Sequence, residues 1–147
     1  MDNYIIKRKI INKPDFLDKN DKIITSDKLD SILPLTDHLV LVLPKDKSTD
    51  NIINKKRLNL LPKHSYIYNI GRGNSIDEDA LINALNNNKI AGAYLDVFKE
   101  EPLSLSSPLR KCPNIFIMPH ASAITPNYMD LFVDEFIIKY NEWGEKN

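Results

Sequence analysis

Four short runs of apolar residues, each followed by a turn or a helical pattern, limit what this chain can fold into. Helical patterns at Asn51–Leu61 and Asp77–Asn86 separate some of these runs. Continuous apolar runs of this length are typical of strands buried on both faces of a parallel sheet. The alternation therefore predicts one α/β domain with a mostly parallel sheet flanked by helices. The four runs are HLVLVLP at 38–44, YIYNI at 66–70, IAGAYLDVF at 90–98 and NIFIM at 114–118.

The remaining elements are shorter or less regular. We expect further strands at Tyr4–Ile11 and Lys22–Thr25, a short helix at Asp27–Leu33 capped by Ser26, and a final amphipathic helix over 125–143. The start of the helix near residue 77 has two solutions. Ser75 and Glu78 have the spacing of a capping box, and Asp77 is an equally good N-cap.

Charge and cysteine content exclude several function classes. Twenty basic and twenty acidic residues cancel, so neither a nucleic acid nor a membrane surface is expected as a partner. No signal-peptide pattern is present, and the longest apolar stretch, Leu39–Leu43, is far too short to span a bilayer. The single cysteine, Cys112, cannot form an internal disulfide, which fits a cytoplasmic location. No metal site is predicted.

Four chemically active side chains follow successive predicted strands. In open α/β sheets the ligand lies beyond the carboxyl ends of the strands. Arg72, Asp96, Glu101 and His120 all fall at or just after such ends. An arginine fork can hold a carboxylate through two parallel hydrogen bonds, and a carboxylate favours the charged form of a neighbouring imidazole. Together these groups describe a site for reducing a 2-keto acid, or for oxidising a 2-hydroxy acid, if a hydride carrier binds nearby.

Each of these residues also has a purely structural interpretation. An arginine between two glycines is often a solvated turn residue, and the acids of DVFKEEP are often exposed loop charges. We assign Glu100, His38 and His64 to such structural roles. The functional interpretation of the other residues gains weight because they occur together, at matched strand ends.

The stretches TDHLVLVLPKDKST, NIGRGNSIDEDALINAL, KIAGAYLDVFKEEPL and NIFIMPHASAIT, in this order and spacing, resemble the D-isomer-specific 2-hydroxyacid dehydrogenase family. The resemblance covers the second half of the family's NAD(P)-binding domain, from about residue 21 to 143. It implies that Arg72 binds the substrate carboxylate, that His120 is the catalytic acid and base, and that Glu101 is the partner of His120.

The resemblance also implies where a cofactor would lie. Asp96, with the backbone around Ile70, would contact the nicotinamide amide. The other expected contacts are Pro44 and Thr49 along the groove, Gly71 beside Ile70, and Ser122 near the nicotinamide.

The identity of the dinucleotide rests on one basic stretch. Lys7-Arg8-Lys9 falls at the end of the second strand of the family, where basic residues accommodate the 2′-phosphate of NADP in place of an acid that binds NAD. Lysines on an edge strand also prevent aggregation. The cofactor is therefore expected to be NADP or NAD, with Arg8 as the candidate 2′-phosphate contact.

The family's pyrophosphate-binding turn, G-x-G-x-x-G, does not occur in this sequence. Its only glycines are Gly71, Gly73, Gly92 and Gly144. The expected fold is thus a Rossmann-like parallel sheet flanked by helices that lacks the family's first strand and phosphate-binding loop. Residues 1–147 would form a partial NAD(P)-binding domain without a substrate domain. In the strand order 3-2-1-4-5-6 the missing strand is central, so two strand edges would lose their partner.

Three outcomes remain open for such a chain. It is a fragment of a longer dehydrogenase, or it associates with a chain that supplies the missing half, or its remaining strands close up. A homodimer is also expected from the resemblance. The expected function is interconversion of a small 2-keto acid and a D-2-hydroxy acid, such as glyoxylate or hydroxypyruvate, with little activity from the isolated chain. The alternative is an inactive remnant that acts as a binding or assembly module.

Overall fold

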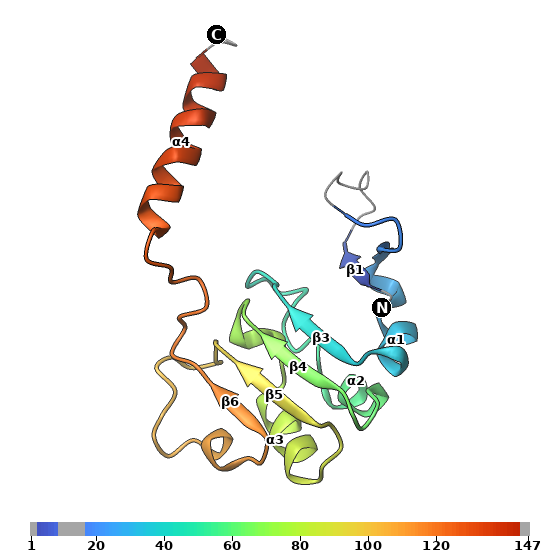
Figure 1. Ribbon diagram of the computed structural model, residues 1–147. Coiled ribbons are helices and arrows are strands. Elements are labelled where there is room, and N and C mark those ends of the chain that lie inside the picture. Colours follow the sequence, from blue (N-terminus) through green and yellow to red (C-terminus); the bar gives the residue numbers. More distant parts are fainter. Residues whose placement is uncertain (1–2, 9–16, 145–147) are drawn as a thin grey trace.

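The computed structural model describes residues 3–8 and 17–144, and it has the predicted α/β architecture (Figure 1). Lys9 and the rest of the predicted strand after residue 8 lie outside the described residues. The strands are β1 Tyr4–Lys7, β2 Lys22–Thr25, β3 His38–Leu41, β4 Tyr66–Asn69, β5 Gly92–Leu95 and β6 Ile115–Ile117. The α-helices are α1 Leu29–Ile32, α2 Lys55–Leu60, α3 Glu78–Asn86 and α4 Tyr128–Gly144.

The strands form two separate parallel sheets. One sheet pairs β1 with β2, and the other has the order β3-β4-β5-β6. Within the described residues no strand pairs with the outer edge of β1 or of β3. This break falls where the order 3-2-1-4-5-6 places the first strand. The prediction of a Rossmann-like sheet without its first strand is confirmed.

Among the described residues, other segments cover only one of the two faces of the four-stranded sheet. Helices α2 and α3 pack on that face, where Leu39, Ile67 and Leu95 join one hydrophobic core (Figure 1). On the other face Val40 is 54% exposed and Phe116 is 60% exposed. The expectation that the run 38–44 is buried on both faces is therefore wrong. β3 alternates between buried and exposed residues because nothing described here covers its second face.

Helix α4 extends away from both sheets (Figure 1). Its large apolar side chains are exposed, and Phe132, Phe136 and Tyr140 stack on one another along the helix. None of the helices that the structure describes is long and apolar enough to cross a membrane.

The ends of two helices are set by side-chain caps. The Asp77 carboxylate accepts a hydrogen bond of 3.1 Å from the amide of Ala80, so α3 begins directly after Asp77. Asn54 caps α2 in the same way through the amide of Arg57, and α2 is therefore shorter than the predicted 51–61. Ser26 does not cap a helix; it begins a 3₁₀ turn that leads into α1.

Removal of the Asp77 cap should destabilise the fold. We expect Asp77→Ala to lower the free energy of unfolding by about 0.5–2 kcal/mol, because it leaves an amide of the first turn without its partner. Asp79→Ala is the matched control, since it removes the same charge from the same turn without removing a cap. Urea denaturation of the two variants checks this, and an equal loss in both would mean that the cap contributes nothing.

Candidate active site

Arg72 lies on a turn that is packed tightly against the segment after β5. A Cβ atom added to Gly73 would lie 1.9 Å from the carbonyl carbon of Phe98, so only glycine fits there. The side chain of Asn69, at the end of β4, holds the turn from inside. Its amide nitrogen donates to the carbonyl oxygen of Arg72 at 3.1 Å, and its oxygen accepts from the amide of Gly71 at 3.2 Å. The Ser75 hydroxyl donates to the same Arg72 carbonyl at 2.8 Å.

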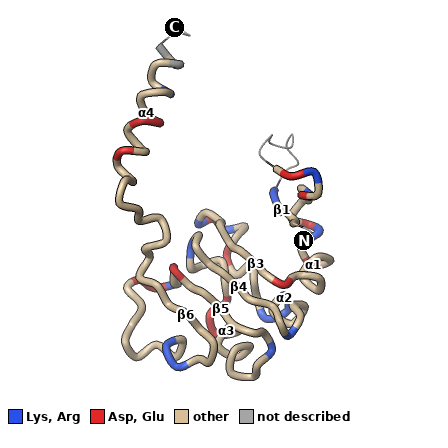
Figure 2. The backbone as a smooth tube through the Cα atoms, in the orientation of Figure 1, with Lys and Arg blue, Asp and Glu red and all other residues tan. Residues whose placement is uncertain are grey.

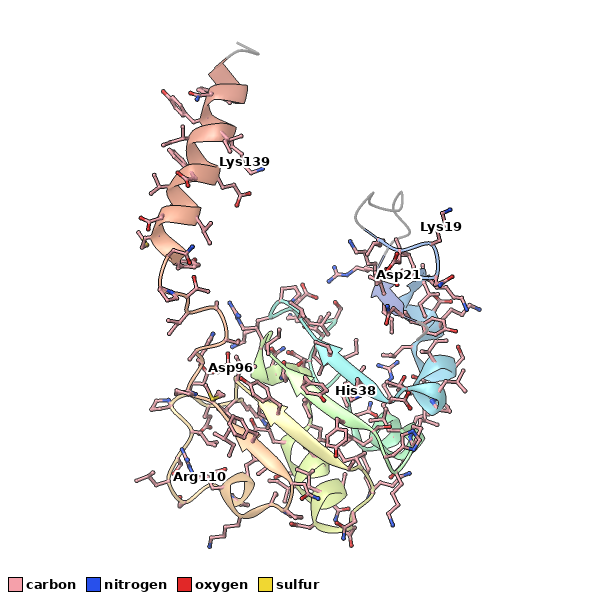
Figure 3. The ribbon with its side chains drawn as sticks, in the orientation of Figure 1. Lys19, Asp21, His38, Asp96, Arg110 and Lys139 are labelled. Atoms are coloured by element: carbon pink, nitrogen blue, oxygen red, sulfur yellow. The ribbon has the colours of Figure 1, made fainter. Side chains whose placement is uncertain are left out.

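Asp96 directly follows β5 (Figure 3), and its carboxylate holds the segment that carries His120. The residue is only 1% exposed. Its carboxylate accepts hydrogen bonds from the amides of Ala121 and Ser122 at 2.7 and 3.0 Å, and from the Ser122 hydroxyl. Burial opposes ionisation of the group, but these hydrogen bonds outweigh burial and lower the pKa of Asp96 below 3.8.

His120 and Glu101 form a directly hydrogen-bonded pair. The distance from Nδ1 of His120 to Oε2 of Glu101 is 2.7 Å, and the other Glu101 oxygen accepts from the amide of Phe98 at 2.9 Å. Burial raises the pKa of Glu101, but the hydrogen bonds from His120 and Phe98 outweigh it and lower that pKa below 4.5. Since Glu101 is ionised it must accept, so Nδ1 carries the proton and Nε2 is the nitrogen left for a substrate.

The backbone of His120 has a positive φ of 57°. Residues other than glycine adopt this conformation at an energetic cost, and such positions occur often at functional sites. The amide of His120 donates to the carbonyl of Asp96 at 2.9 Å, which helps to hold this conformation.

A cavity of about 320 Å³ brings the three predicted catalytic residues together. Arg72, Glu101 and His120 all line it, with Lys45, Lys99, Gly73, Asn74 and Phe98. A second cavity of about 490 Å³ adjoins the Glu101–His120 pair, and its other walls include Leu103, Ile117 and Met118. Chemically, the first cavity combines a guanidinium that can bind a carboxylate with an imidazole that can donate or accept a proton. His38 and His64 line neither cavity, and His64 instead pairs with Asp37 at 2.8 Å.

The predicted cofactor contacts lie around the same sheet edge, and their role in cofactor binding stays a prediction. Thr49 is buried and donates to the carbonyl of Pro44 at 2.9 Å, which closes the loop after β3. Gly71 lets β4 approach the backbone of Leu43, and Ile70 is partly exposed beside it.

Arg8 follows β1 and reaches across the break between the two sheets. Its guanidinium lies 3.7 Å from the Asp46 carboxylate, and both side chains are largely exposed. An exposed ion pair contributes little stability, about 0–1 kcal/mol. A phosphate group could therefore displace Asp46 from Arg8.

Several residues of the site were not predicted. Asn69 and Ser75 organise the Arg72 turn, and Lys45 and Lys99 line the cavity. A signal for Asn69 exists in the sequence, because a polar amide ends an otherwise apolar strand there. The two lysines are ordinary surface residues by sequence alone, and only the fold brings them to the cavity.

Comparisons with known proteins show to which proteins this chain is similar. The family model described as "D-isomer specific 2-hydroxyacid dehydrogenase, NAD binding domain" matches residues 4–122. A glyoxylate/hydroxypyruvate reductase A from Enterobacter sp. is 43% identical over 100 residues, which are 68% of this chain and 32% of that protein. A glyoxylate reductase from Thermofilum pendens is 40% identical over 97 residues, which are 66% of this chain and 29% of that protein. The chain thus spans about a third of the length of these relatives.

Solved structures show the same likeness. An NADPH-dependent glyoxylate/hydroxypyruvate reductase from Sinorhizobium meliloti, in complex with NADP and sulfate, superposes with a TM-score of 0.79 at 28% identity, over 96% of this chain and 45% of that one. A D-isomer specific 2-hydroxyacid dehydrogenase from Xanthobacter autotrophicus, in complex with NADPH and MES, gives a TM-score of 0.73 at 32% identity, over 85% and 38% of the two chains.

The contacts of Asp96 should make stability depend on pH in acid. Because the pKa of Asp96 is lowered in the folded chain, its contribution is complete above the ordinary value and is lost as the pH falls through the lowered one. We expect Asp96→Asn to cost about 1.5–3 kcal/mol of unfolding free energy at pH 7, the range for hydrogen bonds to a charged group. The difference from the unsubstituted chain should shrink in strong acid.

Denaturant titrations at neutral and acid pH measure this difference, with the exposed Asp79→Asn as control. An Asp96→Asn deficit that is the same at both pH values would show that the charge of Asp96 does not hold the 120–122 segment.

Proposed function

The chain belongs to the D-isomer specific 2-hydroxyacid dehydrogenase family, and on this premise we propose that it carries the substrate and proton-transfer half of an NAD(P)-dependent reductase. The reaction is interconversion of a small 2-keto acid and a D-2-hydroxy acid, with glyoxylate and hydroxypyruvate as the first candidates because the relatives are named for them. The observation that carries the proposal is the 2.7 Å contact between His120 and Glu101 in a cavity that Arg72 also lines.

The residues divide the chemistry among them. Arg72 binds the carboxylate of the substrate and turns the keto group toward His120. Nε2 of His120 donates a proton to the keto oxygen as it becomes a hydroxyl, and takes the proton back in the reverse direction. Glu101 fixes the ring through Nδ1 and stabilises its positive charge. When bound, the nicotinamide supplies the hydride that reaches the keto carbon.

The residues around the sheet edge suit the nicotinamide end of such a cofactor. Pro44, Thr49, Ile70 and Asp96 surround the carboxyl ends of β3, β4 and β5, where ligands bind in open α/β sheets. Ser122 and Gly71 lie beside them, and Arg8, which follows β1, would contact a 2′-phosphate in this proposal. The pyrophosphate end has no counterpart in these 147 residues, because the sequence contains no G-x-G-x-x-G turn.

A βα segment from outside these 147 residues completes the domain in this proposal. Its strand inserts between β1 and β3, pairs with both free edges, and opens into the glycine-rich turn. Two observations support this occupant: the unpaired edges of β1 and β3 flank one break, and the chain spans about a third of its relatives. The segment belongs either to the same longer polypeptide or to a separate chain. Pairing of two copies as a homodimer also stays a prediction.

A second candidate function is a non-catalytic binding or assembly module. The exposed apolar face of β3 to β6 and the exposed apolar residues of α4 favour it, because surfaces of this kind mark interaction sites. In that case the His120–Glu101 pair is kept by descent and holds no substrate.

A completed chain tests the two candidates. We fuse to this chain the part of the Enterobacter reductase that precedes its region of similarity to the chain. The assay follows the oxidation of NADPH or NADH by glyoxylate and by hydroxypyruvate. We expect turnover, and we expect His120→Ala to lower kcat by about 100-fold to 10,000-fold while the cofactor Kd changes little. His64→Ala, outside the cavity, is the control.

Cofactor fluorescence titration of the same proteins, and of the 147-residue chain alone, separates binding from chemistry. Saturable cofactor binding with no turnover of either acid would favour the assembly module. Equal losses of turnover and cofactor binding in His120→Ala would assign His120 a structural role.

A further inference from the structure

The cavity that holds the Glu101–His120 pair carries more positive charge than a single carboxylate requires. Its walls include Arg72, Lys45 and Lys99 besides His120, and Glu101 is their only acidic residue. Figure 2 shows basic residues on the loops after β3 and β4, at the edge of the sheet where this cavity lies.

The single acid does not neutralise the two lysines. Both oxygens of Glu101 are engaged, one with His120 and the other with the amide of Phe98. Among the described residues, no salt bridge or side-chain hydrogen bond involves the ammonium group of Lys45 or Lys99. Other cations near acids do pair, as Lys56 and Arg57 do with Asp30. The two ammonium groups are therefore available to a ligand.

Glyoxylate and hydroxypyruvate each offer only one anionic group, and Arg72 suffices to bind it. Two further cationic residues that line the same cavity lower the energy of a second anionic group in the ligand. Lysine suits this task because its ammonium is a compact charge on a flexible stem, which adapts to either a carboxylate or a phosphate.

We propose that Lys45 and Lys99 select substrates with a second anionic group, so that the site takes dianionic 2-keto and 2-hydroxy acids in preference to monoanionic ones. This inference rests on the proposed function, because it assigns the first carboxylate to Arg72. The second group is a carboxylate or a phosphate on the carbon chain beyond the reacting carbon. Each lysine should contribute about twofold to fivefold in affinity at low salt, the range for exposed ion pairs.

Nuclear magnetic resonance titration of the 147-residue chain tests the inference without need of turnover. The probes are D-lactate as the monoanion, D-malate as its dicarboxylate counterpart, and 3-phospho-D-glycerate as the phosphate-bearing acid. The amides of Arg72, Gly73 and Lys99 and the ring of His120 report binding. The variant is Lys45→Gln with Lys99→Gln, and the control of equal charge is Lys47→Gln with Lys63→Gln, since Lys47 and Lys63 are exposed and outside the cavity.

We expect at least one dianion to bind about fivefold or more tightly than D-lactate, and the cavity variant to remove this preference while the control variant keeps it. The comparison of D-malate with 3-phospho-D-glycerate identifies the second group. Equal binding of all three acids, or an equal loss in the control variant, would overturn the inference and leave the proposed function intact. Failure of every acid to shift Arg72 and His120 would overturn both.

Discussion

Both oxygens of the buried Asp96 carboxylate accept hydrogen bonds from the segment after β6, and this contact ties His120 to the end of β5. His120 needs such an anchor, because its backbone adopts a left-handed conformation that a short exposed loop would not hold alone. Once the backbone is fixed, the ring meets Glu101, which the amide of Phe98 also holds. The position of the His120 imidazole therefore depends on β5 and the loop after it more than on the residues next to His120 in the sequence.

The strands and the joint location of the candidate site residues could both be predicted from the sequence, and for the same reason. Short apolar runs locate parallel strands, and parallel strands bring their carboxyl ends to one edge, so Arg72, Glu101 and His120 could be placed together before any contact was known. The choice between two starts of α3 could not be made in this way. Ser75 had the spacing of a capping box, but its hydroxyl is engaged with the carbonyl of Arg72, and that contact exists only in the folded turn. Asp77 then caps the helix.

The burial of β3 shows the limit of such reasoning. The run HLVLVLP predicts that both faces of this strand are shielded from water, but it does not identify the segment that covers the second face. In the described part of the chain no segment does, and Val42 is 67% exposed as a result. The aromatic rings of Tyr94 and Phe116 continue this uncovered surface across the sheet, stacked with their centroids 5.5 Å apart. Within residues 3–8 and 17–144 the prediction of two unpaired edges is confirmed. It came from the strand order of the family, which local burial patterns do not contain.

The break in the sheet separates two parts of the candidate site, and the structure of one does not depend on the other. Arg72, Asp96, Glu101 and His120 follow β4, β5 and β6, which pair consecutively in the intact sheet. The geometry of the proton-transfer pair is thus independent of any strand inserted beside β3. Arg8 and the loop from Pro44 to Thr49 instead flank the break, and the Arg8–Asp46 ion pair that spans it is exposed. In the proposed reductase, completion of the sheet would therefore change the affinity for the dinucleotide far more than the binding and protonation of the substrate. Under that proposal the chain itself assembles Arg72, Glu101 and His120, and the affinity for the cofactor depends on the segment that fills the break.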